Sequence, residues 1–148
     1  MKTEVTSQKS RFLEIIASKR HSTPYFFGIN CCTQTVFQAF TSAFNVQRLG
    51  IERPTRDPAL ADLLVVTGIV NADEAPQLKD IWNKMTAPKK AIAFGACSIT
   101  GGVFRESPNR IETSKIIPID LFLPGCPPSI EAFIRGILDI RESKKFRD

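Results

Sequence analysis

Apolar residues along the chain fall into four short runs, at residues 25–29, 63–67, 91–94 and 116–123. Each run is short enough for a strand and is bounded by glycine, proline or polar residues. The run at 63–67 is unbroken, which is typical of a parallel strand buried on both faces. Pro118 lies within the last run and favours an edge position for that strand.

Between the apolar runs, hydrophobic residues recur at three- and four-residue spacing. This pattern predicts helices over residues 33–46, 74–85 and 129–140. Residues 49–58 are predicted to be irregular, and residues 98–114 are predicted to form a long polar loop. Because strands alternate with helices, the chain is predicted to be an α/β protein. The expected fold is flavodoxin-like, a doubly wound and mostly parallel four-stranded sheet flanked by helices.

The chain has 148 residues, which suits one domain. Residues 1–24 are predicted to be an N-terminal amphipathic docking segment with a short helix at 11–20, and residues 25–148 a single α/β domain. No apolar run approaches the ~20 residues of a membrane span, and no secretory segment is recognised, so we expect a cytoplasmic location.

The net charge is +5, with basic residues densest near the two ends of the chain. Such ends are either simply solvated or dock on an acidic partner or an anionic membrane surface. Nucleic-acid binding is not expected, because the chain carries no recognised binding motif.

The four cysteines are the main candidates for chemistry. Cys31 and Cys32 are adjacent, and Cys97 and Cys126 lie elsewhere, but each position follows an apolar run. In an open parallel sheet the carboxyl ends of the strands meet at one edge, where ligands bind. We therefore expect the four thiols to converge there. Disulfides rarely persist in the cytoplasm, so two bridges are not expected.

Four thiols suit an iron–sulfur cluster, a structural zinc, or a set of inert buried residues. No Cys-x-x-Cys pair typical of small zinc modules is present. Adjacent cysteines in a strand would point to opposite faces, so the backbone at Cys31 and Cys32 must turn for both to reach one cluster. Glycines close to the cysteines are either ordinary turn residues or allow backbone N–H groups to approach sulfur: Gly95, Gly101, Gly102 and Gly125.

Other chemistries have little support in the sequence. No Gly-x-Gly-x-x-Gly follows a strand, and no phosphate-binding loop with lysine is present. A cysteine–histidine hydrolase would need His21, the single histidine, for which the pattern offers no placement near a cysteine.

Three motifs carry a family resemblance: Phe-Gly-Ile-Asn-Cys-Cys at 27–32, Gly-Ala-Cys-Ser-Ile-Thr-Gly-Gly-Val-Phe at 95–104, and Pro-Gly-Cys-Pro-Pro-Ser-Ile-Glu-Ala at 124–132. They resemble the B (PSST-type) subunit of complex I, which is homologous to the small subunit of membrane-bound nickel–iron hydrogenases. The resemblance runs in register from about residue 24 to residue 140. The tandem cysteines resemble the complex I branch, whereas membrane-bound hydrogenases carry a Cys-x-x-Cys pair at this place.

The resemblance implies a 4Fe-4S cluster held by Cys31, Cys32, Cys97 and Cys126, the last cluster of an electron chain. It implies three partners: a large 49-kDa-type (hydrogenase-large-type) subunit at the cluster, a ferredoxin-like iron–sulfur subunit, and a membrane subunit on the N-terminal side. The chain would then be a peripheral subunit on the cytoplasmic side of the membrane. It would belong to a multisubunit oxidoreductase of the NADH- or ferredoxin-to-acceptor type, with no turnover of its own.

Two positions depart from the complex I pattern. Thr35 stands where the family has a glutamate, and Ala59 stands where it has an arginine. Because these family residues lie around the quinone site, the departures indicate a divergent member. Its acceptor would be quinone-type or altered, for example sulfane sulfur. The alternatives are the small subunit of a membrane-bound energy-converting nickel–iron hydrogenase and, in another class, a metal-free assembly scaffold.

Overall fold

The computed structural model describes residues 21–142, so the predicted helix at 11–20 lies outside the described residues. The centre of the molecule is a parallel sheet in the order β1-β2-β4-β6. The predicted α/β fold with a four-stranded parallel sheet is confirmed. Its strands are β1 (Pro24–Phe27), β2 (Leu63–Thr67), β4 (Lys90–Phe94) and β6 (Leu121–Leu123).

The outer side of β1 carries a remnant of a further strand. Ser22 forms a parallel bridge with Ile51: its N–H donates to Gly50 O at 2.9 Å, and its carbonyl accepts from Glu52 N at 2.9 Å. Ile51 is fully buried, and apart from this one-residue bridge its segment is irregular, as predicted. With this remnant counted, the strand order is the flavodoxin order 2-1-3-4-5. The point where that order reverses lies between β1 and β2.

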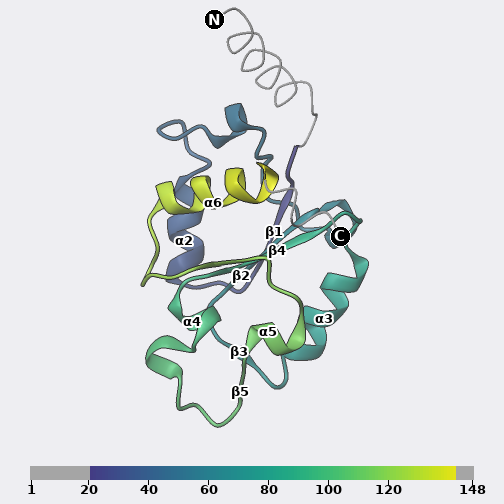
Figure 1. Ribbon diagram of the computed structural model, residues 1–148, viewed down its shortest axis with the longest axis vertical. Helices are drawn as coiled ribbons and strands as arrows, with labels where there is room; N and C mark the ends of the chain where they lie inside the picture. The colour runs from purple at the N-terminus through teal and green to yellow at the C-terminus, as the bar shows by residue number, and fades with distance from the viewer. Residues whose placement is uncertain (1–20, 143–148) are drawn as a thin grey trace, which may run out of the picture.

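Helices cover both faces of the sheet (Figure 1). Helices α2 (Cys31–Gln38) and α6 (Ile130–Glu142) lie together on one face, and α3 (Ala75–Lys84) lies on the other. Alternate strand residues face the two cores: Val65 packs toward α2 and α6, and Leu64 toward α3. Across residues 21–142, no helix is both long and apolar enough to cross a bilayer.

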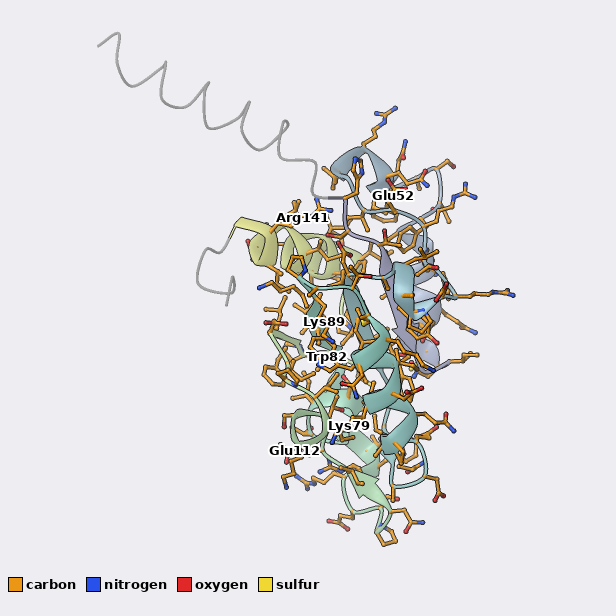
Figure 2. The ribbon with its side chains drawn as sticks, turned by 90° about the vertical axis from the view of Figure 1, so that its right-hand side faces the viewer. Glu52, Lys79, Trp82, Lys89, Glu112 and Arg141 are labelled. Atoms are coloured by element: carbon orange, nitrogen blue, oxygen red, sulfur yellow. The ribbon has the colours of Figure 1, made fainter. Side chains whose placement is uncertain are left out.

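Helix α3 is held to the sheet by a contact visible in Figure 2. Lys89 Nζ lies 4.7 Å from the ring centroid of Trp82 and donates to the Trp82 carbonyl at 2.5 Å. Lys89 directly precedes β4, so this contact fixes the end of α3 at the start of the next strand.

Helix α2 is shorter than predicted. It ends at Gln38, and a 3-10 turn η1 (Val46–Leu49) follows, so the prediction of one helix over 33–46 is wrong in its second half. Val46 and Ala39 are both fully buried, and Val46 N donates to Ala39 O at 3.4 Å. The chain therefore reverses early to place Val46 in the core, which leaves Phe44 exposed instead of buried on the helix.

Residues 98–114 are not the long loop that the sequence predicts. They form a small lobe below the sheet in Figure 1, with β5 (Arg110–Ile111) pairing antiparallel to β3 (Val70–Asn71). The strand predicted at 116–123 begins only at Leu121, and Ile116 instead ends a short helix over residues 113–116. Thr113 Oγ1, in that helix, donates to Ser98 O at 2.9 Å. The remaining elements are η2 (Pro58–Leu60), β3 (Val70–Asn71), α4 (Ala96–Ile99), η3 (Gly102–Phe104), β5 (Arg110–Ile111) and α5 (Thr113–Ile116).

Candidate metal centre

The tandem cysteines occupy the first turn of α2. The chain leaves β1 at Gly28, whose φ of 101° is in the region that favours glycine. Asn30 then caps the helix, with Oδ1 accepting from Cys32 N at 3.1 Å and from Thr33 N at 3.3 Å. The backbone at Cys31 and Cys32 is helical, so the prediction that it must leave the strand conformation is confirmed.

A polar network behind this turn joins the ends of β1 and β2. Thr33 Oγ1 lies 2.8 Å from Thr67 Oγ1 and donates to Gly28 O at 3.0 Å. Asn30 Nδ2 donates to Thr67 Oγ1 at 3.2 Å, and both threonines are buried. The network fixes the direction in which Cys31 and Cys32 leave the sheet. Sequence reasoning missed these threonines; the available signal was a hydroxyl at the end of the otherwise apolar run at 63–67.

The other two cysteines lie on neighbouring loops. Cys97 is in α4, directly after β4, and Cys126 follows β6. Two backbone hydrogen bonds hold these loops together: Gly95 N donates to Leu123 O and Ala96 N donates to Gly125 O, both at 2.8 Å. The structure therefore brings both loops to the edge of the sheet where Cys31 and Cys32 lie.

Electrostatic effects among the thiols show that all four lie in one neighbourhood. Burial raises the pKa of Cys32 to about 12, with further contributions from charge and a hydrogen bond at Cys31 and from charge at Cys97 and Cys126. Burial also raises the pKa of Cys97, and Cys126 and Cys31 add to that effect. Cys32 is buried, whereas Cys31 and Cys126 are exposed, so the group lies at the surface with one sulfur in the core.

The four candidate glycines have different neighbours. A Cβ at Gly95 would lie 2.6 Å from Cys32 Sγ, and one at Gly102 would lie 3.4 Å from Cys97 Sγ. At Gly125 the added atom would meet Pro128, and at Gly101 it would meet the side chain of Arg110. Gly95 and Gly102 thus lie against cysteine sulfur, and the other two shape their loops. Their role toward a cluster stays a prediction.

A hollow of about 310 Å³ opens between the ends of β1 and β2, where the strand order reverses. This is the place where sheets of this type bind ligands. It is lined by Ile29, Cys31, Cys32, Thr67, Gly68, Asn71, Glu74, Cys97 and Phe104, among others.

The donor set fits an iron–sulfur cluster in its chemistry. Among residues 21–142, no three His, Cys, Asp or Glu side chains are arranged to hold one metal ion. A cluster needs a wider ligand arrangement, because each thiolate binds a separate iron atom and the sulfurs lie around the cluster. Four free thiols from three loops are suitable ligands for such a cluster.

A family model described as NADH ubiquinone oxidoreductase, 20 Kd subunit, matches residues 28–140. The chain belongs to this family. The B 2 subunit of the NADH-quinone oxidoreductase of Symbiobacterium thermophilum is 36% identical over 123 residues, which cover 82% of this chain and 68% of that protein. The B subunit of the F(420)H(2) dehydrogenase of Methanosarcina mazei is 35% identical over 143 residues, covering 95% of this chain and 77% of that one. The match to the K 2 subunit of the NAD(P)H-quinone oxidoreductase of Acaryochloris marina covers 57% of that protein.

Solved structures similar to the chain include two from redox complexes. A chain of the membrane-bound sulfane sulfur reductase, described as an archaeal respiratory membrane complex, has a TM-score of 0.74 and 29% identity, covering 88% of this chain and 73% of that one. A chain of an NAD+-reducing [NiFe]-hydrogenase has a TM-score of 0.57 and 17% identity, covering 80% of this chain and 88% of that one, which shows the fold alone. The resemblance to the PSST-type subunits of complex I is confirmed: the chain is of the kind found in multisubunit oxidoreductases.

The two departures from the complex I pattern lie near the surface and carry no charge. Thr35 Oγ1 donates to Cys31 O at 3.1 Å, one turn back along α2. Ala59 is in η2, where its N–H donates to Asp57 Oδ1 at 3.0 Å and its carbonyl accepts from Thr86 Oγ1 at 2.5 Å. Thr35 is thus tied to the backbone of the first cysteine.

Proposed function

We propose that this chain is an electron-transfer subunit that carries one 4Fe-4S cluster, bound by Cys31, Cys32, Cys97 and Cys126. Its place would be the peripheral part of a membrane-bound, complex I-like oxidoreductase, on the cytoplasmic side. The observation that carries the proposal is that all four cysteines of the chain gather at one edge of the sheet. Thiolates in this number are the usual ligands of such a cluster.

When bound, the cluster would supply one-electron transfer, and the chain's own residues would control its surroundings. Cys32 lies in the core, so water has little access to its sulfur. Gly95 and Gly102 keep side chains away from sulfur on the β4 side. The Asn30 cap and the Thr33–Thr67 contact hold the tandem cysteines in place before a cluster enters.

Exposed apolar residues around the hollow support a covering partner. Ile29 is 97% exposed, Val103 is 83% exposed and Phe104 is 54% exposed, and the first and last of these line the hollow. Large exposed apolar side chains next to a site are typical of an interface. We propose that the large 49-kDa-type subunit covers this surface and that electrons leave there. A ferredoxin-like iron–sulfur subunit would supply the electrons, and a membrane subunit would lie on the N-terminal side.

The acceptor is proposed to be altered rather than an ordinary quinone. Thr35, in the helix of the tandem cysteines, and Ala59, before the start of β2, stand where the complex I pattern has a glutamate and an arginine. The 29% identity to a chain of the sulfane sulfur reductase supports an acceptor of the sulfane-sulfur class. A quinone-type acceptor is the second candidate, favoured by the match to NADH-quinone oxidoreductase subunits.

The cluster is tested by comparing the intact complex, purified without oxygen, with its Cys97→Ser variant. We expect the variant to contain about four fewer iron atoms per complex and to lose one cluster signal in electron paramagnetic resonance (EPR). Ser114→Ala is the control, because Ser114 is exposed in the same lobe. Native electrophoresis checks that the variant complex is assembled. Zinc in place of iron, or an assembled Cys97→Ser complex with unchanged iron and signals, would refute the proposal.

A further inference from the structure

One carboxylate shares the hollow with the cysteines. Among the described residues that line it, Glu74 is the only Asp, Glu, Lys, Arg or His, and it lies there with Cys31, Cys32 and Cys97. Glu74 is half-buried just before α3. Neither the thiol ligand set nor the capping network of α2 uses this side chain.

The position of Glu74 is fixed by backbone contacts. Glu74 Oε2 accepts from Asn71 N at 3.0 Å, and Glu74 N donates to Asn71 O at 3.0 Å. Asn71 pairs with Arg110 across the β3–β5 ladder, and Ala72 N donates to Asn109 O at 2.8 Å. The turn that carries the carboxylate is therefore held to the small lobe.

No cation in the described part of the chain neutralises this carboxylate through an ion pair: within residues 21–142, no lysine, arginine or histidine forms one with Glu74. Arg110 is a neighbour on β5, but its Nε donates to the carbonyl of Arg105 at 3.4 Å. Asp73, the adjacent carboxylate, is exposed and does not line the hollow. Among the described residues that line the hollow, Glu74 is therefore the charged side chain that a cluster bound to Cys31, Cys32 and Cys97 would face.

We propose that the Glu74 carboxylate lowers the reduction potential of the cluster, an inference that rests on the proposed function. Reduction adds one electron and makes the cluster more negative, so a nearby negative charge disfavours the reduced form. The cluster takes one electron from its donor and passes one to its acceptor, and no bond forms or breaks at Glu74. By destabilising the reduced form, the carboxylate makes the cluster a stronger donor to the acceptor.

The test is a potentiometric titration of the intact complex at one pH, followed by the EPR signal that Cys97→Ser removes. Glu74→Gln keeps an oxygen that can accept from Asn71 N and removes the charge. We expect its midpoint potential to rise by about 59 mV, a tenfold change in the equilibrium constant of a one-electron couple. Glu74→Asp keeps the charge and should remain near the wild-type potential.

The matched control is Asp73→Asn, which removes one negative charge from the neighbouring residue outside the hollow. We expect it to shift the potential much less than Glu74→Gln. Equal shifts in the two variants, or no shift in Glu74→Gln, would overturn the inference. Loss of the cluster from Glu74→Gln but not from Glu74→Asp would also overturn it, by showing a structural role. A wild-type complex without the signal would instead refute the proposed function.

Discussion

Gly95 lies directly against the sulfur of Cys32: a Cβ built on Gly95 would be 2.6 Å from Cys32 Sγ. Gly95 directly follows β4, whereas Cys32 is in the first turn of α2, so this contact joins two of the segments that carry cysteines. Gly95 also has a φ of 95°, which other residues rarely adopt. Its missing side chain therefore satisfies both the backbone turn and the space needed by the sulfur.

Replacing Gly95 with alanine should destabilise the metal-free chain. The positive φ costs about 1 kcal/mol or more, and the collision with sulfur adds about 1–3 kcal/mol. Gly50→Ala is the control, because Gly50 has a φ of 76° but lies at the other end of β1, beside Ser22. Urea unfolding should show a larger loss for Gly95→Ala, and the intact complex should lose iron. Equal losses for the two variants would contradict a role for the Cys32 contact.

The part of the site that depends on strand ends could be predicted from the sequence. A cysteine that follows an apolar run must lie at the end of a strand, and parallel strands place those ends at one edge. This reasoning gave the placement of Cys31, Cys32, Cys97 and Cys126 at one edge of the sheet. The turn at Cys31 followed from geometry, because two adjacent side chains in a strand point to opposite faces.

The parts that depend on pairing between distant segments could not be predicted. Strand β3 has only two residues and is defined by its pairing with β5, so no local pattern marks it. The bridge between Ser22 and Ile51 involves one residue on each side. The contact between Thr33 and Thr67 requires knowing that β1 and β2 are neighbours. The hollow that contains Glu74 depends on these same pairings.

The buried hydroxyl contact should contribute measurably to stability. Thr33→Val keeps the side-chain shape but removes the group that donates to Gly28 O and lies 2.8 Å from Thr67 Oγ1. Because buried polar atoms lose a partner, we expect the free energy of unfolding of the metal-free chain to fall by about 1–3 kcal/mol. Thr41→Val is the control, since Thr41 is exposed and bonds only its own turn. Similar unfolding midpoints for the two variants would rule out a structural role for the network.

The thiols of the metal-free chain should react at different rates with iodoacetamide. Thiolate is the reactive form, and the pKa of Cys32 is raised to about 12, so at about pH 9 very little of it is ionised. Cys32 is also buried, whereas Cys31 and Cys126 are exposed. Mass spectrometry should find Cys31 and Cys126 modified first, Cys97 later and Cys32 last. Early modification of Cys32 in the folded chain would contradict its placement in the core.

Stability should depend on the ionisation of Asp62. Burial raises the pKa of Asp62 above 3.8, although Thr23 N–H, which donates to Oδ1 at 2.7 Å, and the charge of Arg141 act against this. Between 3.8 and the raised pKa, the folded chain holds a proton that the unfolded chain has released. The free energy of unfolding should therefore fall as pH rises through this window. Urea midpoints of the metal-free chain, measured between about pH 4 and pH 7, should fall less for Asp62→Asn than for the wild type.

Arg141 provides a second test of how the ionisation of Asp62 affects stability. Its guanidinium, at the end of α6 in Figure 2, donates to Leu49 O, to Gly50 O at 2.5 Å and to Ser22 Oγ at 3.1 Å. Arg141→Met removes the cation that lowers the pKa of Asp62, so the fall in stability should extend to higher pH. It also leaves two carbonyls without this donor, so stability should fall at every pH by about 1–3 kcal/mol. Arg135→Met, a change at an exposed position on the same helix, should alter neither the pH dependence of stability nor the stability at any one pH. If stability depends on pH in the same way in Arg141→Met and in the wild type, Arg141 acts only through its hydrogen bonds to Leu49, Gly50 and Ser22.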